Sequence, residues 1–153
     1  MVWMEQTISD TGFAEGALRS NDLSTEFEAA GGALMGCTVI RTLIDLVWLI
    51  NEAHTPADRL TLGLIKGTSA AADVADPVSE PFADWAYHRT LFSGMDHGLV
   101  AADTAQVFHA DVRSMRKIDE VGETWWLIYE GTALNTVATY DVTANVRTLI
   151  KLP

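Results

Sequence analysis

The chain has 153 residues, of which 48% are hydrophobic and 20% charged, and this is the size and composition of one folded domain. Its formal net charge is -11 and its ten Lys and Arg residues form no continuous run, which argues against a nucleic-acid-binding surface. Cys37 is the only cysteine, so the sequence excludes an intrachain disulfide and a cysteine-based metal site.

The first 35 residues differ in composition from the rest of the chain. Residues 2–7 alternate between apolar and polar side chains, which permits a short strand, and a stretch rich in glycine, serine and alanine follows. Residues 21–28 favour a brief helical turn capped by Asn21 or Asp22. We therefore expect an extended N-terminal arm over residues 1–35, held either by a partner subunit or by the chain's own domain.

The rest of the chain, from residue 38 onward, follows a period of two, the pattern of β-strands. The predicted strands are 38–50, 59–66, 85–92, 106–112, 124–130, 136–143 and 145–152, with a bend or bulge at Ala144–Asn145. Loops are expected at 67–84 and 93–105. Because helical periodicity is almost absent, residues 36–153 predict an all-β domain, an antiparallel β-sandwich with jelly-roll topology.

The stretch Thr38–Ile50 carries apolar side chains on both alternating faces, which predicts a central strand with both faces covered. Residues 40–46 are echoed by residues 146–152, and this echo predicts two antiparallel neighbours in one sheet. Arg41 and Arg147 occupy equivalent positions in the two copies. We expect each arginine to pair with a carboxylate of the domain or to face another subunit. The carboxylates considered are Asp45, Asp111 and Asp141.

Motifs that carry chemistry are few. His109 and Asp111 lie two apart on a predicted strand, as in the metal-binding pair of jelly-roll iron oxygenases. The other histidines all precede His109, so we expect a half-buried strand in which Asp111 pairs with an arginine. The acidic loop with Asp73, Asp76, Glu80 and Asp84 contains two prolines and favours an irregular surface loop over a Ca²⁺ site. We expect no catalytic, cofactor-binding or metal-binding residues.

The chain contains several distinctive short motifs: Gly36-x-Thr38-x-x-Arg41, Ala-Asp-Pro at 75–77, Asp84-Trp85, Asp111-Val-Arg113-Ser114-x-Arg116 and Val146-Arg147-Thr148-Leu149-x-x-Leu152-Pro153. Together they resemble those of a group of small virion proteins encoded by tailed bacteriophages. The resemblance covers roughly residues 36–153. It implies a protein that decorates or cements the outer surface of a capsid after synthesis in the host cytoplasm, and it supplies no catalytic residues.

The sequence thus predicts a structural virion protein and not an enzyme. Its expected partners are the major capsid protein or other virion proteins and further copies of itself, with a trimer favoured and with no nucleic acid or membrane. The candidate interface residues are Trp3, Phe13, Phe27, Asp76, Pro77, Pro81, Arg113, Arg116 and Lys117.

Two alternatives stay open. The first is a phage tail or host-recognition module of the same fold. The second is a small metal-dependent enzyme or sugar-binding β-sandwich, in which exposed tryptophans stack on sugar rings. The tryptophans considered for that role are Trp85, Trp125 and Trp126.

Overall fold

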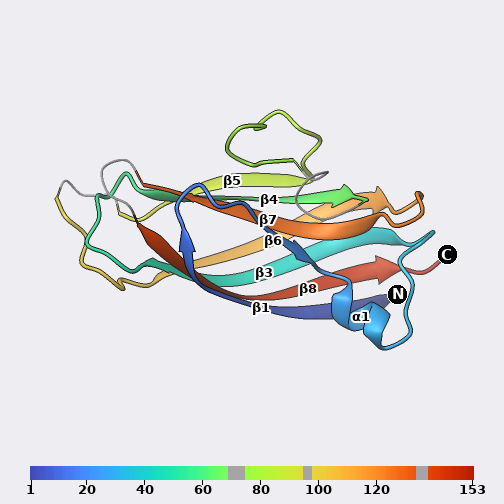
Figure 1. Ribbon diagram of the computed structural model, residues 1–153. Coiled ribbons are helices and arrows are strands. Elements are labelled where there is room, and N and C mark those ends of the chain that lie inside the picture. Colours follow the sequence, from blue (N-terminus) through green and yellow to red (C-terminus); the bar gives the residue numbers. More distant parts are fainter. Residues whose placement is uncertain (69–74, 95–97, 134–137) are drawn as a thin grey trace.

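The computed structural model describes residues 1–68, 75–94, 98–133 and 138–153, which form eight strands and one short helix, α1 (Thr25–Ala29). The strands are β1 (Val2–Ala14), β2 (Arg19–Asp22), β3 (Thr38–Ile50), β4 (Arg59–Gly67), β5 (Tyr87–Phe92), β6 (Gln106–Lys117), β7 (Thr124–Thr132) and β8 (Thr139–Lys151). They build two stacked four-stranded sheets, with strand orders β1-β8-β3-β6 and β2-β7-β4-β5 (Figure 1). All pairings are antiparallel, which confirms the predicted all-β sandwich.

The strand order also establishes the jelly-roll topology. The first strand pairs with the last, the second with the seventh, the third with the sixth and the fourth with the fifth. This is the pattern of one long antiparallel hairpin rolled up into two sheets. The prediction that the two echoed segments are antiparallel neighbours is confirmed, because β3 and β8 are adjacent and antiparallel at the centre of their sheet.

Residues 1–35 are not an arm outside the sandwich, which corrects the sequence-based expectation. The predicted short strand at 2–7 is the beginning of β1, which runs to Ala14 along β8. Met4 and Ile8 on β1 are buried in the core, and β2 forms the edge of the second sheet. The polar composition that suggested an arm arises because β1 is also an edge strand and turns its other face to solvent.

Three smaller predictions also change. Helix α1 begins after Ser24, and Asp22 accepts a hydrogen bond from the Ser24 backbone N–H (2.8 Å) instead of capping the helix directly. The two strands expected at 136–143 and 145–152 are one continuous strand, β8, which has no break at Ala144–Asn145; residues 136 and 137 lie outside the described residues. β3 is central, but only its inner face is covered, since its burial alternates along the strand.

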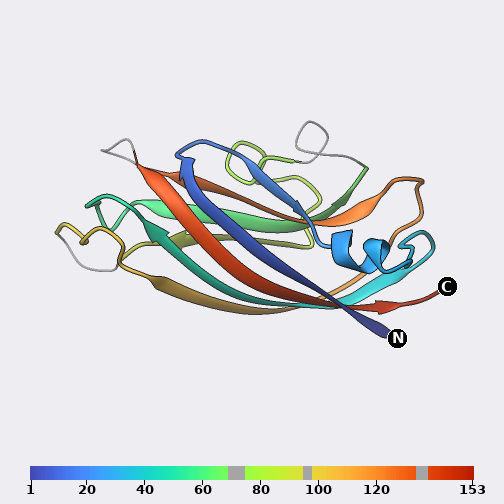
Figure 2. The same ribbon diagram turned by 60° about the horizontal axis from the view of Figure 1, so that its bottom comes forward.

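The two chain termini lie side by side at one end of the sandwich, next to α1 (Figure 2). The register explains this arrangement, because Val2 at the start of β1 pairs with Ile150 near the end of β8. β3 begins and β6 ends at the same place, where Thr38 pairs with both Lys117 and Lys151. We call this region the terminal end of the molecule. In the described part of the chain no helix has the length and apolar character of a membrane span.

Candidate interaction surfaces

The space between the two sheets is filled by aromatic side chains. Phe13 stacks on Tyr140 at 5.6 Å between ring centroids, and Trp48 stacks on the same ring at 6.5 Å. Trp125 and Tyr129 are fully buried beside them. Surfaces of the described residues that can bind a partner therefore lie on the outside of the sandwich. Phe13, a candidate interface residue, belongs to this core with 6% of its surface exposed, which corrects its expected place in an interface.

The outer face of the β1-β8-β3-β6 sheet is open to solvent. Its outward side chains on the two edge strands are mostly exposed, and those on the two central strands are exposed or half-buried. The register sets three rows across the four strands: Trp3, Leu149, Arg41 and Arg113; then Glu5, Arg147, Leu43 and Asp111; then Thr7, Asn145, Asp45 and His109. Charged and apolar side chains thus alternate over a broad sheet surface.

The sequence echo produces local symmetry on this face. Thr42 lies opposite Thr148 on the buried side, and their hydroxyls are 3.4 Å apart. On the outer side, one Arg-Thr-Leu triplet faces the other in reverse, so that Arg41 lies opposite Leu149 and Leu43 lies opposite Arg147. Each arginine therefore lies beside a leucine of the other strand and keeps its charged end in water.

Both arginines pair with carboxylates of their own domain, as predicted. Arg41 donates two hydrogen bonds to Asp111, at 2.7 and 2.6 Å, and Arg147 lies 3.9 Å from Asp45. The hydrogen bond from Arg41 lowers the pKa of Asp111. Exposed pairs of this kind add little stability, so their main effect is to hold a fixed pattern of charge.

His109 and Asp111 both contact charged side chains on the neighbouring strand β3. The two side chains share the outer face, as their spacing predicts, but His109 Nδ1 lies 2.7 Å from Asp45 while Asp111 binds Arg41. No group of three or more histidine, cysteine or acidic side chains within the described ranges is arranged to hold a metal ion. Two of the three tryptophans considered for sugar stacking are not accessible to a sugar, because Trp125 is fully buried and Trp126 is 7% exposed.

The outer face of the other sheet is covered by the chain itself. The segment 75–86 passes over β4 and β5 (Figure 1), and Trp85 packs in a second apolar cluster with Trp126 and Ile128. The Trp85 ring lies directly over Gly63, where an added Cβ would be 2.4 Å from the indole. Arg116 also fixes this segment through two hydrogen bonds to Asp84, at 3.1 and 2.8 Å.

Gly63→Ala is expected to displace Trp85 and to destabilise the fold by about 1–3 kcal/mol, the usual cost of overpacking. Urea unfolding followed by tryptophan fluorescence measures this change. The control is the same substitution in a Trp85→Ala background, where the clash no longer exists and the cost should largely disappear. An equal cost in both backgrounds would show that the indole does not require this glycine.

Two carboxyl groups meet under the segment 75–86. Glu130 on β7 is 9% exposed and forms a hydrogen bond with the Asp76 carboxyl. Burial, followed by the hydrogen bond and charge of Asp76, raises the pKa of Glu130 to about 7. Burial alone would raise the pKa of Asp76 too, but the N–H groups of Ser79 and Val78 and the Glu130 hydrogen bond lower it. One proton is thus shared between the segment and β7.

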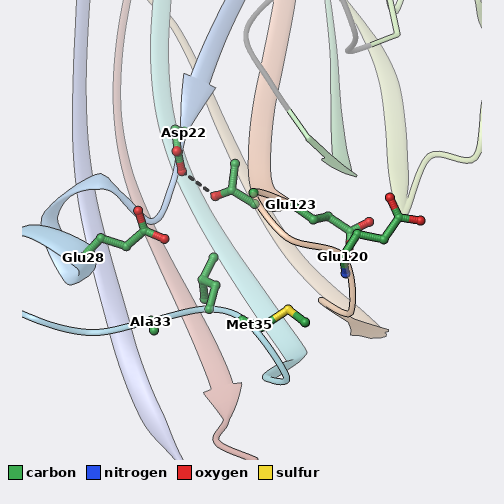
Figure 3. Close-up of a pocket in the computed structure, with 9 residues that line it drawn as sticks. Asp22, Glu28, Ala33, Met35, Glu120 and Glu123 are labelled. Atoms are coloured by element: carbon green, nitrogen blue, oxygen red, sulfur yellow. Dashed lines mark hydrogen bonds between the residues drawn. The ribbon is translucent and has the colours of Figure 1, made fainter.

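A pocket of about 210 Å³ opens at the terminal end, between α1 and the connection from β6 to β7. Asp22 and Glu123 in its wall are already bound, since Asp22 accepts from Thr124 Oγ1 (2.7 Å) and Glu123 lies 3.0 Å from Lys66 Nζ. Glu28 and Glu120 stand on opposite sides of the pocket (Figure 3). Within the described residues, neither of these two carboxylates has a hydrogen-bonding or ion-pair partner.

The nine candidate interface residues fall into separate places. Trp3, Arg113 and Lys117 are exposed near the terminal end, on the open sheet or at its margin. Phe27 on α1 packs against the core, and Phe13 lies inside it. The others lie in the covering segment 75–86 or bind it: Pro77 is buried, Pro81 is exposed, Asp76 binds Glu130, and Arg116 on β6 binds Asp84. Part of the loop 67–84 therefore packs against the chain's own sandwich. Its residues 69–74 lie outside the described residues.

Sequence reasoning missed Glu130 and Gly63. A signal for Glu130 was available, because it shares the alternating face of Trp126 and Ile128 and so extends an apolar row. Gly63 lies between two leucines inside a strand, and a glycine in a strand interior often marks the close approach of another group. No local pattern identifies Trp85 as that group, because the contact is set by the path of the loop.

No family model matches the chain, and no curated protein matches it in sequence. Among solved structures, it is similar to turnip yellow mosaic virus at 11% identity, 98% and 93% coverage of the two chains and a TM-score of 0.44. It is also similar to the tobacco streak virus coat protein dimer (12%, 98% and 86%, 0.42) and to Desmodium yellow mottle tymovirus (13%, 99% and 90%, 0.37). Because these TM-scores are below 0.5, the jelly-roll assignment rests on the strand order alone.

Proposed function

We propose that this chain is a structural protein of a virus particle, which acts by binding other protein subunits. The observation that supports the proposal is that the outer face of one sheet is covered whereas the outer face of the other is open. The interior is packed with aromatic rings and one outer face is covered by residues 75–86, while the other outer face is open and holds a fixed pattern of charged and apolar side chains. Such a molecule is built to present a rigid surface.

The fold agrees with this proposal by analogy. Jelly rolls occur in viral capsid proteins, in lectins and in cupins. Fold alone does not decide between these classes, so the described surfaces must. The closed interior disfavours a cupin-like internal site, and the burial of Trp125 and Trp126 disfavours a lectin-like stacking surface.

The more specific proposal is a cement or decoration protein on the outer capsid surface of a tailed bacteriophage, assembled as a trimer. The short motifs between residues 36 and 153 support the phage origin by resemblance. The net charge of -11 suits an outer surface, away from packaged nucleic acid. Trp3, Pro81, Arg113 and Lys117 are the candidate residues that lie at an exposed surface.

The copy number in purified particles tests the proposal. Quantitative mass spectrometry of particles should find hundreds of copies for a capsid lattice protein, on the order expected if each lattice subunit binds its own partner. A handful of copies would favour the tail or host-recognition module instead. Absence of the chain from particles would refute a structural virion role.

A further inference from the structure

The exposed apolar side chains gather at the terminal end. The described residues include eleven large apolar side chains that are exposed, and six of them lie near the first residues of β1 and β3, near the last residues of β6 and β8, or in the connection from β6 to β7. They are Met1, Trp3, Met35, Met115, Val121 and Leu152. Scattered apolar side chains are normal on a surface, but a concentration at one end marks an interaction site.

The same end carries charges that are not paired within the chain. Arg113, Lys117 and Lys151 are exposed there, and no described carboxylate lies within ion-pair distance of them. Arg113 lies opposite Arg41, whose hydrogen bonds already occupy Asp111.

The cations and the carboxylates lie on different sides of the terminal end. Lys117 and Lys151 flank Thr38 on the sheet, whereas Glu28 and Glu120 border the pocket beside α1 (Figure 3). The net charge of the chain is -11, so this basic group is opposite in sign to the charge of the molecule as a whole.

We infer that the terminal end binds a second copy of this chain, with the basic group of one copy set against the acidic pocket rim of the other. This inference rests on the proposed assembly function and names its partner. Charge complementarity orients the two copies, and the apolar side chains at this end, Trp3 and Met35 among them, supply the contact area that loses water. Methionine side chains suit such a contact because they adapt to the opposing surface.

Charge reversal tests the inference on the full chain by sedimentation velocity at several protein concentrations. The wild type is expected to associate, and Lys151→Glu and Glu28→Lys are each expected to weaken association by about tenfold or more. The effect of Glu28→Lys is the sharper result, because it lowers the net negative charge and would strengthen association if general repulsion governed it. Glu80→Lys is the matched control, since it makes the same charge change on the covered side of the molecule and should not weaken association.

The double variant Lys151→Glu/Glu28→Lys restores the complementary charges and is expected to recover most of the wild-type association. A mixture of the two single variants distinguishes a symmetric pair from a ring of three. Every contact is restored in a mixed pair, whereas a ring of three must keep one contact between like charges. High salt should weaken the wild-type association.

A wild-type chain that stays monomeric at high concentration would overturn the inference, as would single variants that associate like the wild type. These failures are separate from failure of the proposed function. A monomer found in hundreds of copies on particles removes the self-contact and keeps the virion role. A chain that self-associates but is absent from particles keeps the self-contact and refutes the virion role.

Discussion

Trp125→Ala is expected to lower the free energy of unfolding by about 3–5 kcal/mol, the usual cost of removing a large buried aromatic side chain. Trp125 is fully buried between the two sheets, and its Nε1–H donates to Thr42 Oγ1 at 3.1 Å. The substitution therefore opens a cavity and removes a buried hydrogen bond at the point in the β3–β8 pair where Thr42 faces Thr148.

Urea unfolding at one pH, followed by circular dichroism, measures this loss. Phe82→Ala is the control, because Phe82 is 99% exposed and should change stability by no more than about 0.5 kcal/mol. A loss below about 1 kcal/mol for Trp125→Ala would mean that this indole does not hold the sheets together.

Glu130→Gln is expected to remove a pH dependence from the stability of the fold. The pKa of Glu130 is raised from its ordinary value of 4.5 to about 7, so the folded state binds this proton more tightly than the unfolded state. The stability from the shared proton is complete below pH 4.5 and is lost as the pH rises through about 7. At about pH 8 the ionised Glu130 costs the folded state up to about 3 kcal/mol relative to low pH.

The glutamine side chain keeps a donor for the Asp76 carboxylate at every pH. Relative to the wild type, the variant should be similar in stability at about pH 5 and more stable by up to about 3 kcal/mol at about pH 8. The groups that face Glu130 are Asp76 from the covering segment, Thr61 from β4 and the Gly16 backbone from the β1–β2 connection. None of these supplies a cation to the ionised form.

Unfolding curves at several pH values, compared for wild type, Glu130→Gln and Glu80→Gln, separate this effect from the titration of other groups. Glu80 is an exposed carboxylate on the same covering segment, so its variant should keep the wild-type pH dependence. Parallel pH profiles for the wild type and Glu130→Gln would contradict the shared proton.

The sequence determined much of the architecture. Period-two alternation located the strands from β3 onward because each of them has one face in the core, and the Arg-Thr-Leu echo identified the β3–β8 pair because the two triplets match in reverse. Pairing of the two arginines was predictable too, since their side chains lie on the same sheet face as Asp45 and Asp111. These are properties of single strands and of their direct neighbours.

Other features required the tertiary structure, because they join residues that are distant in sequence. Residues 1–35 looked like an arm, since an edge strand with one wet face has no more apolar content than a loop. The Glu130–Asp76 proton and the Gly63–Trp85 contact exist only because segment 75–86 crosses its own sheet. The same holds for the terminal end. Its basic and acidic groups come from β6, β8, α1 and a turn, and they reach the same end of the molecule because β3 pairs with both β6 and β8 beside the pocket.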